Sequence, residues 1–127
     1  MAQSSNAFHE DPASLEAGTM DRHRAIVSLM EELEAVDWYD QRVDAAQDEE
    51  LRAILAHNRD EEKEHAAMVL EWLRRRDPHW DEQLRQYLFT DKPILEVEEE
   101  EEEEKGTGSG QASDGSLGIG SLRGAAR

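Results

Sequence analysis

Glu62-Lys63-Glu64-His65 decides the fold, because its first and last residues stand where an amphipathic helix normally carries apolar side chains. The positions around it recur at alternating intervals of four and three, the seam of a helix packed against other helices: Leu51, Leu55, Asn58, Glu62, His65, Val69 and Trp72. An unpaired buried carboxylate is costly. We therefore expect Glu62 and His65 to point inward and to be held there by a cation, most simply a metal ion.

A second seam precedes the first one. Thr19, which follows Gly18, can act as the N-cap of a helix that we expect to run to about Val43. Glu32 is the charged member of its seam. The complete seam, at the same spacing, is Ala25, Leu29, Glu32, Val36, Tyr39 and Val43, beside a second apolar stripe of Ile26, Met30 and Leu33.

The two helices are predicted to form an antiparallel hairpin. Asp48 begins an acidic stretch that is typical of an N-cap followed by the first turn of a helix. The midpoint of Glu32 and Glu62 is residue 47, inside the proposed turn. At about 1.5 Å per residue, both carboxylates then lie at the same height, roughly 20 Å from the bend. The two charged seam positions should therefore meet.

Composition limits the classes of function. The chain has 127 residues, a formal net charge of −17 and no cysteine. The charge argues against nucleic acid or an anionic membrane as a partner, and the lack of cysteine leaves carboxylate and imidazole as metal ligands. Neither a secretory signal in residues 1–6 nor an apolar run of transmembrane length is visible. We expect a cytoplasmic protein.

The chain divides into four predicted parts. In the N-terminal arm we expect no more regular structure than a short turn at Asp11-Pro12. After the hairpin, Asp77-Pro78 should begin a short third helix. The glutamates of the run at 98–104 repel one another and bury nothing, which predicts disorder. The parts are a flexible arm (1–18), a helical domain (19–92), a disordered acidic and Gly/Ser linker (93–113) and a tail with three aliphatic residues (114–127).

A two-helix hairpin has too little interior to close a hydrophobic core. We therefore predict an all-α fold, an antiparallel hairpin plus a short C-terminal helix, in which dimerisation completes a four-helix bundle. Glu32, Glu62 and His65 would supply half of the carboxylate-rich di-metal arrangement known from such bundles, and a second chain the other half. These oxygen and nitrogen ligands suit iron or manganese.

Simpler interpretations stay open for several residues. Glu62 could pair with Arg59 or Lys63 at a solvated edge, and Tyr39 could either hydrogen-bond a ligand carboxylate or only pack. Most acidic helix faces are solvated, although two clusters at helical spacing could also bind cations. The clusters are Glu31, Glu34 and Trp38 on the first helix, and His57, Glu61 and Glu64 on the second.

The residues carry a resemblance to encapsulated ferritins. It spans about residues 20–90, and the segment Leu117–Arg123 is similar to the targeting peptide with which such cargo docks inside an encapsulin shell. The matching stretches are Arg22–Ser28, Glu31–Asp44 and Ile54–Met68. The helical domain would then be half of a ferritin.

The resemblance implies a ferroxidase that oxidises Fe(II) to Fe(III) with dioxygen, for iron storage and detoxification inside an encapsulin nanocompartment. A di-iron centre would form between the subunits of a homodimer, within a ring-shaped decamer. By position, Glu32, Glu62 and His65 match iron ligands, and Tyr39 lies near the centre. The site through which iron enters is matched by Glu31, Glu34 and Trp38. An outer site for calcium or another divalent cation is matched by His57, Glu61 and Glu64.

The alternative class is a non-enzymatic protein, either an acidic helical adaptor or a metal-binding cargo protein. In an adaptor, Glu62 and His65 would serve only helix register or the choice of partner. Oxygen consumption that depends on iron distinguishes the ferroxidase from both.

Overall fold

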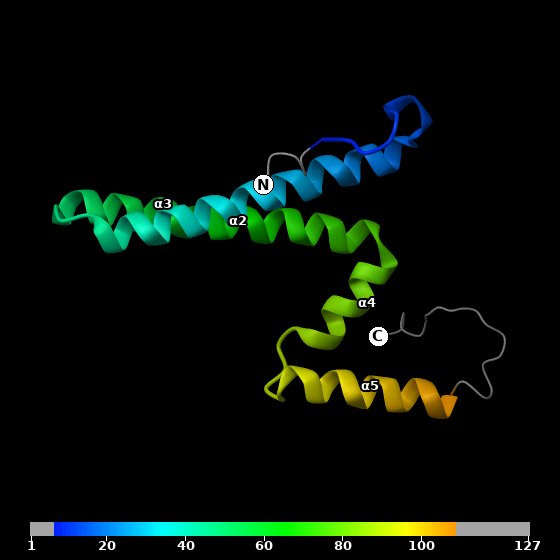
Figure 1. Cartoon of the computed structure of the whole chain (residues 1–127). Coiled ribbons are helices and arrows are strands. Elements are labelled where there is room, and N and C mark those ends of the chain that lie inside the picture. The colour runs from blue at the N-terminus through cyan, green and yellow to red at the C-terminus, as the bar shows by residue number, and fades with distance from the viewer. Residues whose placement is uncertain (1–6, 109–127) are drawn as a thin grey trace. The chain divides into compact units, whose positions relative to one another are not determined.

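The computed structural model describes residues 7–108, in which all regular structure is helical, as predicted (Figure 1). It separates into two compact units, the first ending at Leu73 and the second beginning at Arg74. We describe each unit by itself. The elements are the 3-10 turn η1 (Pro12–Ser14) and the α-helices α2 (Ala17–Ala45), α3 (Glu49–Arg76), α4 (Pro78–Tyr87) and α5 (Ile94–Gly108).

In the first unit, α2 and α3 lie side by side as an antiparallel hairpin (Figure 1). The predicted cap of α3 is present, since Asp48 Oδ2 accepts the backbone N–H of Leu51 at 2.9 Å. The guanidinium of Arg52 donates to the carbonyl of Ala46 at 2.6 Å and ties α3 to the end of α2. The predicted tight helical hairpin is therefore confirmed.

The beginning of α2 differs from the prediction. The helix starts at Ala17, two residues before the expected cap at Thr19, and its N-cap position is Glu16, whose side chain makes no capping hydrogen bond. The Thr19 hydroxyl instead accepts a hydrogen bond from Arg22 at 3.2 Å. Thr19 lies inside the helix, where a residue cannot be the N-cap, so the prediction for Thr19 was wrong.

The segment before α2 packs back onto that helix. The rings of Phe8 and His23 lie with their centroids 4.3 Å apart. The expected turn at Asp11-Pro12 is η1, in which Asp11 Oδ1 accepts the backbone N–H of Ala13 at 3.0 Å. From Phe8 onward, the N-terminal arm is therefore held against α2.

A single hairpin buries little apolar surface. Apart from Leu51, the seam residues of both helices are only partly buried, and Ala66 and Leu73 are the fully buried residues among those described in the first unit. Apolar side chains of this size normally need a partner surface. Those left exposed on the hairpin are Ile26, Leu33, Trp38, Leu51, Ile54 and Met68.

The second unit begins with a well-capped helix. Asp77 Oδ1 accepts the backbone N–H groups of His79 and Trp80 at 3.0 and 3.3 Å, and Pro78 occupies the first turn. Asp81 accepts hydrogen bonds from Arg85, at 2.9 Å from Nε, and from Arg74. These cations, Arg85 first, lower the pKa of Asp81, so the stability that this cluster contributes is lost as the pH falls through the lowered pKa.

The acidic segment is a helix where disorder was predicted. Residues 94–108 form α5, so the prediction for 93–113 was wrong over that range; residues 109–113 lie outside the described part. Val97 is buried to 8% exposure, and α5 contacts α4. Lys92 Nζ lies 2.9 Å from Glu100 Oε1. One apolar anchor and this ion pair offset the repulsion among the glutamates.

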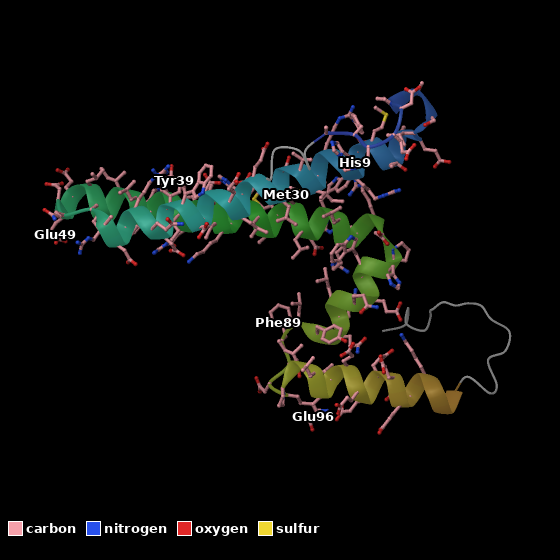
Figure 2. All side chains as sticks on the ribbon, viewed as in Figure 1. His9, Met30, Tyr39, Glu49, Phe89 and Glu96 are labelled. Atoms are coloured by element: carbon pink, nitrogen blue, oxygen red, sulfur yellow. The ribbon has the colours of Figure 1, made fainter. Side chains whose placement is uncertain are left out.

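The turn between α4 and α5 contains a residue in an unusual conformation. Phe89 has a φ of 64°, in the left-handed region, which costs a non-glycine residue about 1–2 kcal/mol. Figure 2 shows Phe89 at this turn and Glu96 at the start of α5. Burial, and then the charges of Glu98, Glu101 and Glu102, raise the pKa of Tyr87 in α4. The acidic face of α5 therefore lies close to α4.

We expect Val97→Asp to unfold α5, because it places a charge at the one position that is buried among residues 94–106 of a helix that otherwise repels itself. The helical signal in circular dichroism at 222 nm should fall in proportion to the fraction of the helical residues that belong to α5, which has 15 residues. Leu95→Asp is the matched control, since Leu95 is 71% exposed on the same helix. An equal loss of signal in both variants would mean that Val97 does not anchor α5.

Candidate metal centre

Three side chains from the two helices of the hairpin meet at one level. Glu32 comes from α2, and Glu62 and His65 come from successive turns of α3. His65 Nδ1 lies 3.4 Å from Glu62 Oε1 and 3.7 Å from Glu32 Oε1. One ligand atom from each residue lies within 4.8 Å of the others. The structure thus brings together the three residues that the seams placed at the same height.

The cluster is half open to solvent. The side chains of Glu32 and Glu62 are 25% and 26% exposed, and that of His65 is 45% exposed. The two carboxylates are mostly buried, as expected for Glu62, whereas the imidazole of His65, which was also expected to point inward, is more exposed. An ion could therefore reach the cluster, and donors from another molecule could complete it.

The two carboxyl groups of the cluster titrate as a pair. A hydrogen bond from one carboxyl group to the other, with burial and the charge of Glu62, raises the pKa of Glu32. The same hydrogen bond lowers the pKa of Glu62, and His65 lowers it further. Two carboxylates this close cannot both ionise without cost, so the pair takes up a proton more readily than two separate carboxyl groups would. A bound cation would compete with a proton for these oxygens.

The donor set fits a first-row transition metal. Two carboxylates and one imidazole are the oxygen and nitrogen ligands that iron and manganese take in proteins, and a thiolate is absent from the sequence. Three residues cannot fill the coordination spheres of two ions. Among residues 7–108, this is the one group of three or more acidic or histidine side chains close enough to hold an ion. A di-metal centre here needs ligands from a second copy.

The other predicted sites are not assembled within one chain. Trp38 is 48% exposed on α2, and Glu31 is also exposed. In the second cluster, His57 Nε2 lies 3.2 Å from Glu61 Oε2, and the structure does not join Glu64 to this pair. Each set stays a prediction. Glu34, between the exposed and the buried faces of α2, is partly buried.

Tyr39 packs against a cation within its own helix. Its ring lies 5.3 Å from the guanidinium carbon of Arg42. Figure 2 shows Tyr39 on α2, seven residues beyond Glu32. The structure therefore supports packing as its role within one chain, and the role near the metal stays a prediction.

The pairing of Arg59 with Asp40 was not predicted from the sequence. Arg59 Nη1 lies 3.1 Å from Asp40 Oδ1 on the other helix, and Arg59 Nε lies 3.1 Å from Asp60 Oδ1. Lys63 also pairs with Asp60, at 3.5 Å. The alternative in which Arg59 or Lys63 pairs with Glu62 is therefore wrong, because both cations have nearer carboxylates.

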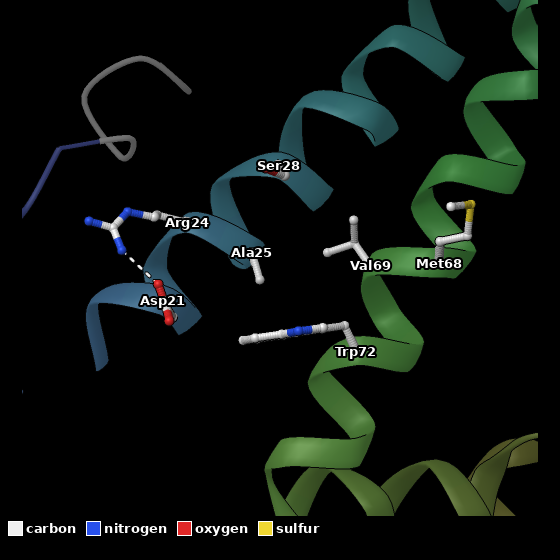
Figure 3. Close-up of a pocket in the computed structure, with 7 residues that line it drawn as sticks. All are labelled: Asp21, Arg24, Ala25, Ser28, Met68, Val69 and Trp72. Atoms are coloured by element: carbon white, nitrogen blue, oxygen red, sulfur yellow. Dashed lines mark hydrogen bonds and ion pairs between the residues drawn. The ribbon is translucent and has the colours of Figure 1, made fainter. Parts of the chain in front are cut away.

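An apolar groove lies along the same hairpin, toward the start of α2. It has a volume of about 490 Å³ and is lined by Ala25, Ser28, Met68, Val69 and Trp72, with the Asp21–Arg24 ion pair at its rim (Figure 3). Such a lining accepts apolar side chains rather than an ion. The candidate ion site is therefore the cluster.

No helix in the described part of the chain combines the length and the apolar character that a membrane span requires.

Comparisons with known proteins agree with this geometry. A family model described as EncFtn-like matches residues 7–91. The "Encapsulated ferritin-like protein" of Rhodospirillum rubrum is 64% identical over 132 residues, which cover 99% of this chain and 94% of that protein. The "Ferritin-like protein" of Thermotoga maritima is 62% identical over 92 residues, 72% of this chain and 81% of that protein.

A more distant relative and a solved structure match as well. The "Encapsulin nanocompartment cargo protein EncC" of Myxococcus xanthus is 38% identical over 65 residues, 48% of this chain and 50% of that protein. The crystal structure of protein ne0167 from Nitrosomonas europaea has a TM-score of 0.68 and 65% identity, covering 69% of this chain and 97% of that one. The family match extends over more than half of the sequence and includes Glu32, Glu62 and His65. The chain belongs to the EncFtn-like family of encapsulated ferritins.

Proposed function

We propose that this protein is a ferroxidase, which takes Fe(II) as its substrate and oxidises it with dioxygen at a di-iron centre shared by two copies of the chain. The observation that carries the proposal is the cluster of Glu32, Glu62 and His65, with ligand atoms within 4.8 Å of one another. Membership of the family supports it. The biological role would be iron storage and detoxification inside an encapsulin shell.

The proposed centre lies between two chains because one chain is incomplete in two respects. Its cluster offers three donors, and its hairpin leaves large apolar residues of both helices exposed. Pairing two hairpins around a two-fold axis would bury those residues and place two clusters together. We propose a homodimer of this kind as the active unit, within the decameric ring that the resemblance implies.

The residues of the cluster would bind, balance charge and release a proton. When bound as a pair, ferrous ions supply the electrons that reduce dioxygen. The carboxylates of Glu32 and Glu62 would give up any proton that they hold on binding, and their two negative charges would then favour the more highly charged ferric product. Since protons compete with the ions for these oxygens, apparent metal affinity should fall as the pH falls.

The surrounding acidic residues would act outside the centre. We propose that Glu31, Glu34 and Trp38 guide iron toward it, and that His57 and Glu61, already 3.2 Å apart, bind an outer cation with Glu64. Cations are attracted by the net charge of −17.

The proposed location inside a shell rests on the names of two relatives and on the C-terminal segment of the sequence. Two of the relatives are named as encapsulated or as nanocompartment cargo. The segment Leu117–Arg123, which lies outside the described residues, would dock this chain to the inner face of an encapsulin shell. We therefore propose that iron is oxidised inside that compartment.

Anaerobic loading followed by exposure to air tests the proposed activity. Purified protein with two Fe(II) per pair of chains should consume oxygen and develop the near-ultraviolet absorbance of ferric iron. Bound Fe(II) without oxygen consumption would instead identify a metal-binding cargo protein. Failure to bind Fe(II) at all would identify a non-enzymatic adaptor.

We also expect Fe(II) to promote assembly. Each chain holds half of the ligands, so an ion that binds only the paired state stabilises that state by mass action. Without the ion, the paired carboxylates repel one another or stay protonated. Native mass spectrometry or sedimentation under anaerobic conditions should show larger species after Fe(II) is added. A mass distribution that does not respond to Fe(II) would contradict the shared centre.

A further inference from the structure

We propose that Asp40 and Arg59 are positioning residues, whose ion pair fixes the register in which α2 presents Glu32 to Glu62 and His65. The pair links the helices directly, with Arg59 Nη1 3.1 Å from Asp40 Oδ1. Asp60 holds the same guanidinium at Nε, also at 3.1 Å. The consequence for iron oxidation rests on the proposed function, whereas the register is a property of the chain itself.

Apolar packing specifies this register weakly. Both seams alternate steps of four and three, so sliding one helix by seven residues, about 10 Å, again sets apolar positions against apolar positions. In the described part of the first unit, only Ala66 and Leu73 are fully buried. Charged pairs at defined heights distinguish such registers, as they do in coiled coils.

Polar contacts join α2 and α3 along the hairpin. At the turn, Arg52 donates to the carbonyl of Ala46, and Asp40 pairs with Arg59 farther along. The third contact, between Glu32 and His65, belongs to the cluster itself. The middle pair lies about 12 Å from Glu32 along α2.

The middle pair differs from the cluster in the sign of its interaction. Within the cluster, the carboxylates of Glu32 and Glu62 have ligand atoms within 4.8 Å of each other, and like charges at this distance repel. The Asp40–Arg59 pair is attractive whether or not an ion is bound. The side chain of Arg59 is also mostly buried, with 23% of it exposed. This pair therefore keeps the helices in register while the centre is empty of cations.

The test replaces each partner by its neutral isostere and titrates the full chain with Co²⁺ by calorimetry. Asp40→Asn and Arg59→Gln should both weaken Co²⁺ binding, by roughly threefold, because apparent affinity falls with the fraction of chains in the competent register and exposed ion pairs shift such equilibria only modestly. Simple electrostatics predicts opposite changes, since removing the positive charge of Arg59 should strengthen binding of a cation. Stronger binding by Arg59→Gln would overturn the proposal.

Two further variants serve as controls. Asp40→Glu keeps a carboxylate for Arg59 and should restore the parent affinity. Asp21→Asn removes the same charge from α2 but breaks a pair within that helix, Asp21 with Arg24 at 2.6 Å. It should bind Co²⁺ as the parent does. A loss in Asp21→Asn equal to that in Asp40→Asn would assign the effect to net charge and overturn the proposal.

A distance measurement separates this proposal from the proposed function. The chain has no cysteine, so spin labels can be placed at Asp37→Cys and Ala67→Cys, two exposed positions at different heights of the hairpin. In labelled chain diluted with unlabelled chain, Asp40→Asn should add a second distance, shifted by about 5 Å or more, because the alternative register moves one helix about 10 Å along the other. The parent distance alone would overturn the proposal. A parent that binds Co²⁺ but oxidises no iron would contradict only the ferroxidase.

Discussion

Glu62→Ala is expected to abolish most of the iron oxidation by the full-length protein. Glu62 contributes one of the two carboxylates of the cluster, and its Oε1 lies 3.4 Å from His65 Nδ1. Loss of a residue that merely supports a metal ligand typically costs 10- to 100-fold in affinity or activity, so loss of a ligand should cost at least roughly 100-fold. Glu32→Ala and His65→Ala should behave alike, because the three donors are needed together. Initial rates of oxygen consumption measure the effect.

The matched control is Glu50→Ala. Glu50 is an exposed glutamate of the same helix, in its first turn, and its loss changes the net charge of the chain by the same amount as Glu62→Ala. Its rate should equal that of the parent. Removing a repelling carboxylate should also let the metal-free Glu62→Ala chain pair more readily, which sedimentation can follow. Parent rates in all three cluster variants would reject the assigned centre.

Deletion of residues 114–127 is expected to abolish capture by an encapsulin shell and to leave iron oxidation unchanged. The described cluster and the family match both end before residue 92, so no proposed ligand is lost. The deleted tail holds the aliphatic segment Leu117–Arg123, to which the docking role is assigned. Co-expression with the shell protein, followed by isolation of intact shells, gives the amount of cargo retained.

A substituted tail makes this test sharper. Replacing Leu117, Ile119 and Leu122 by Ser keeps the length and charge of the chain and removes only its apolar side chains. The substituted chain should be excluded from shells, as the chain without residues 114–127 should be. If either chain were captured as efficiently as the parent, the docking peptide would have to lie elsewhere in the sequence.

The sequence predicted the hairpin and the cluster because both follow from local rules. The N-caps at Asp48 and Asp77 depend on one side chain and the backbone that follows it. The meeting of Glu32 with Glu62 was predicted from helical rise and from the position of one turn. These predictions needed no knowledge of the rest of the fold.

Features that depend on tertiary contacts were beyond sequence reasoning. Asp40 and Arg59 are two charges among many on polar helix faces, and nothing in the spacing of either residue selects the other. α5 was missed because the repulsion in the glutamate run is evident from the sequence, whereas the burial of Val97 is evident only once α5 lies against α4. The second half of a shared centre would lie on another chain.

The helical state of α5 also sets the reach of whatever follows it. Its 15 residues span about 22 Å as a helix and would span roughly 50 Å if extended. A docking segment beyond residue 108 would therefore be attached through a rigid spacer while α5 is folded, and through a flexible one whose maximum reach is about twice as long if α5 melts. Since the effective concentration of a tethered ligand depends on tether length, the packing of Val97 would adjust how densely cargo can gather at a shell wall.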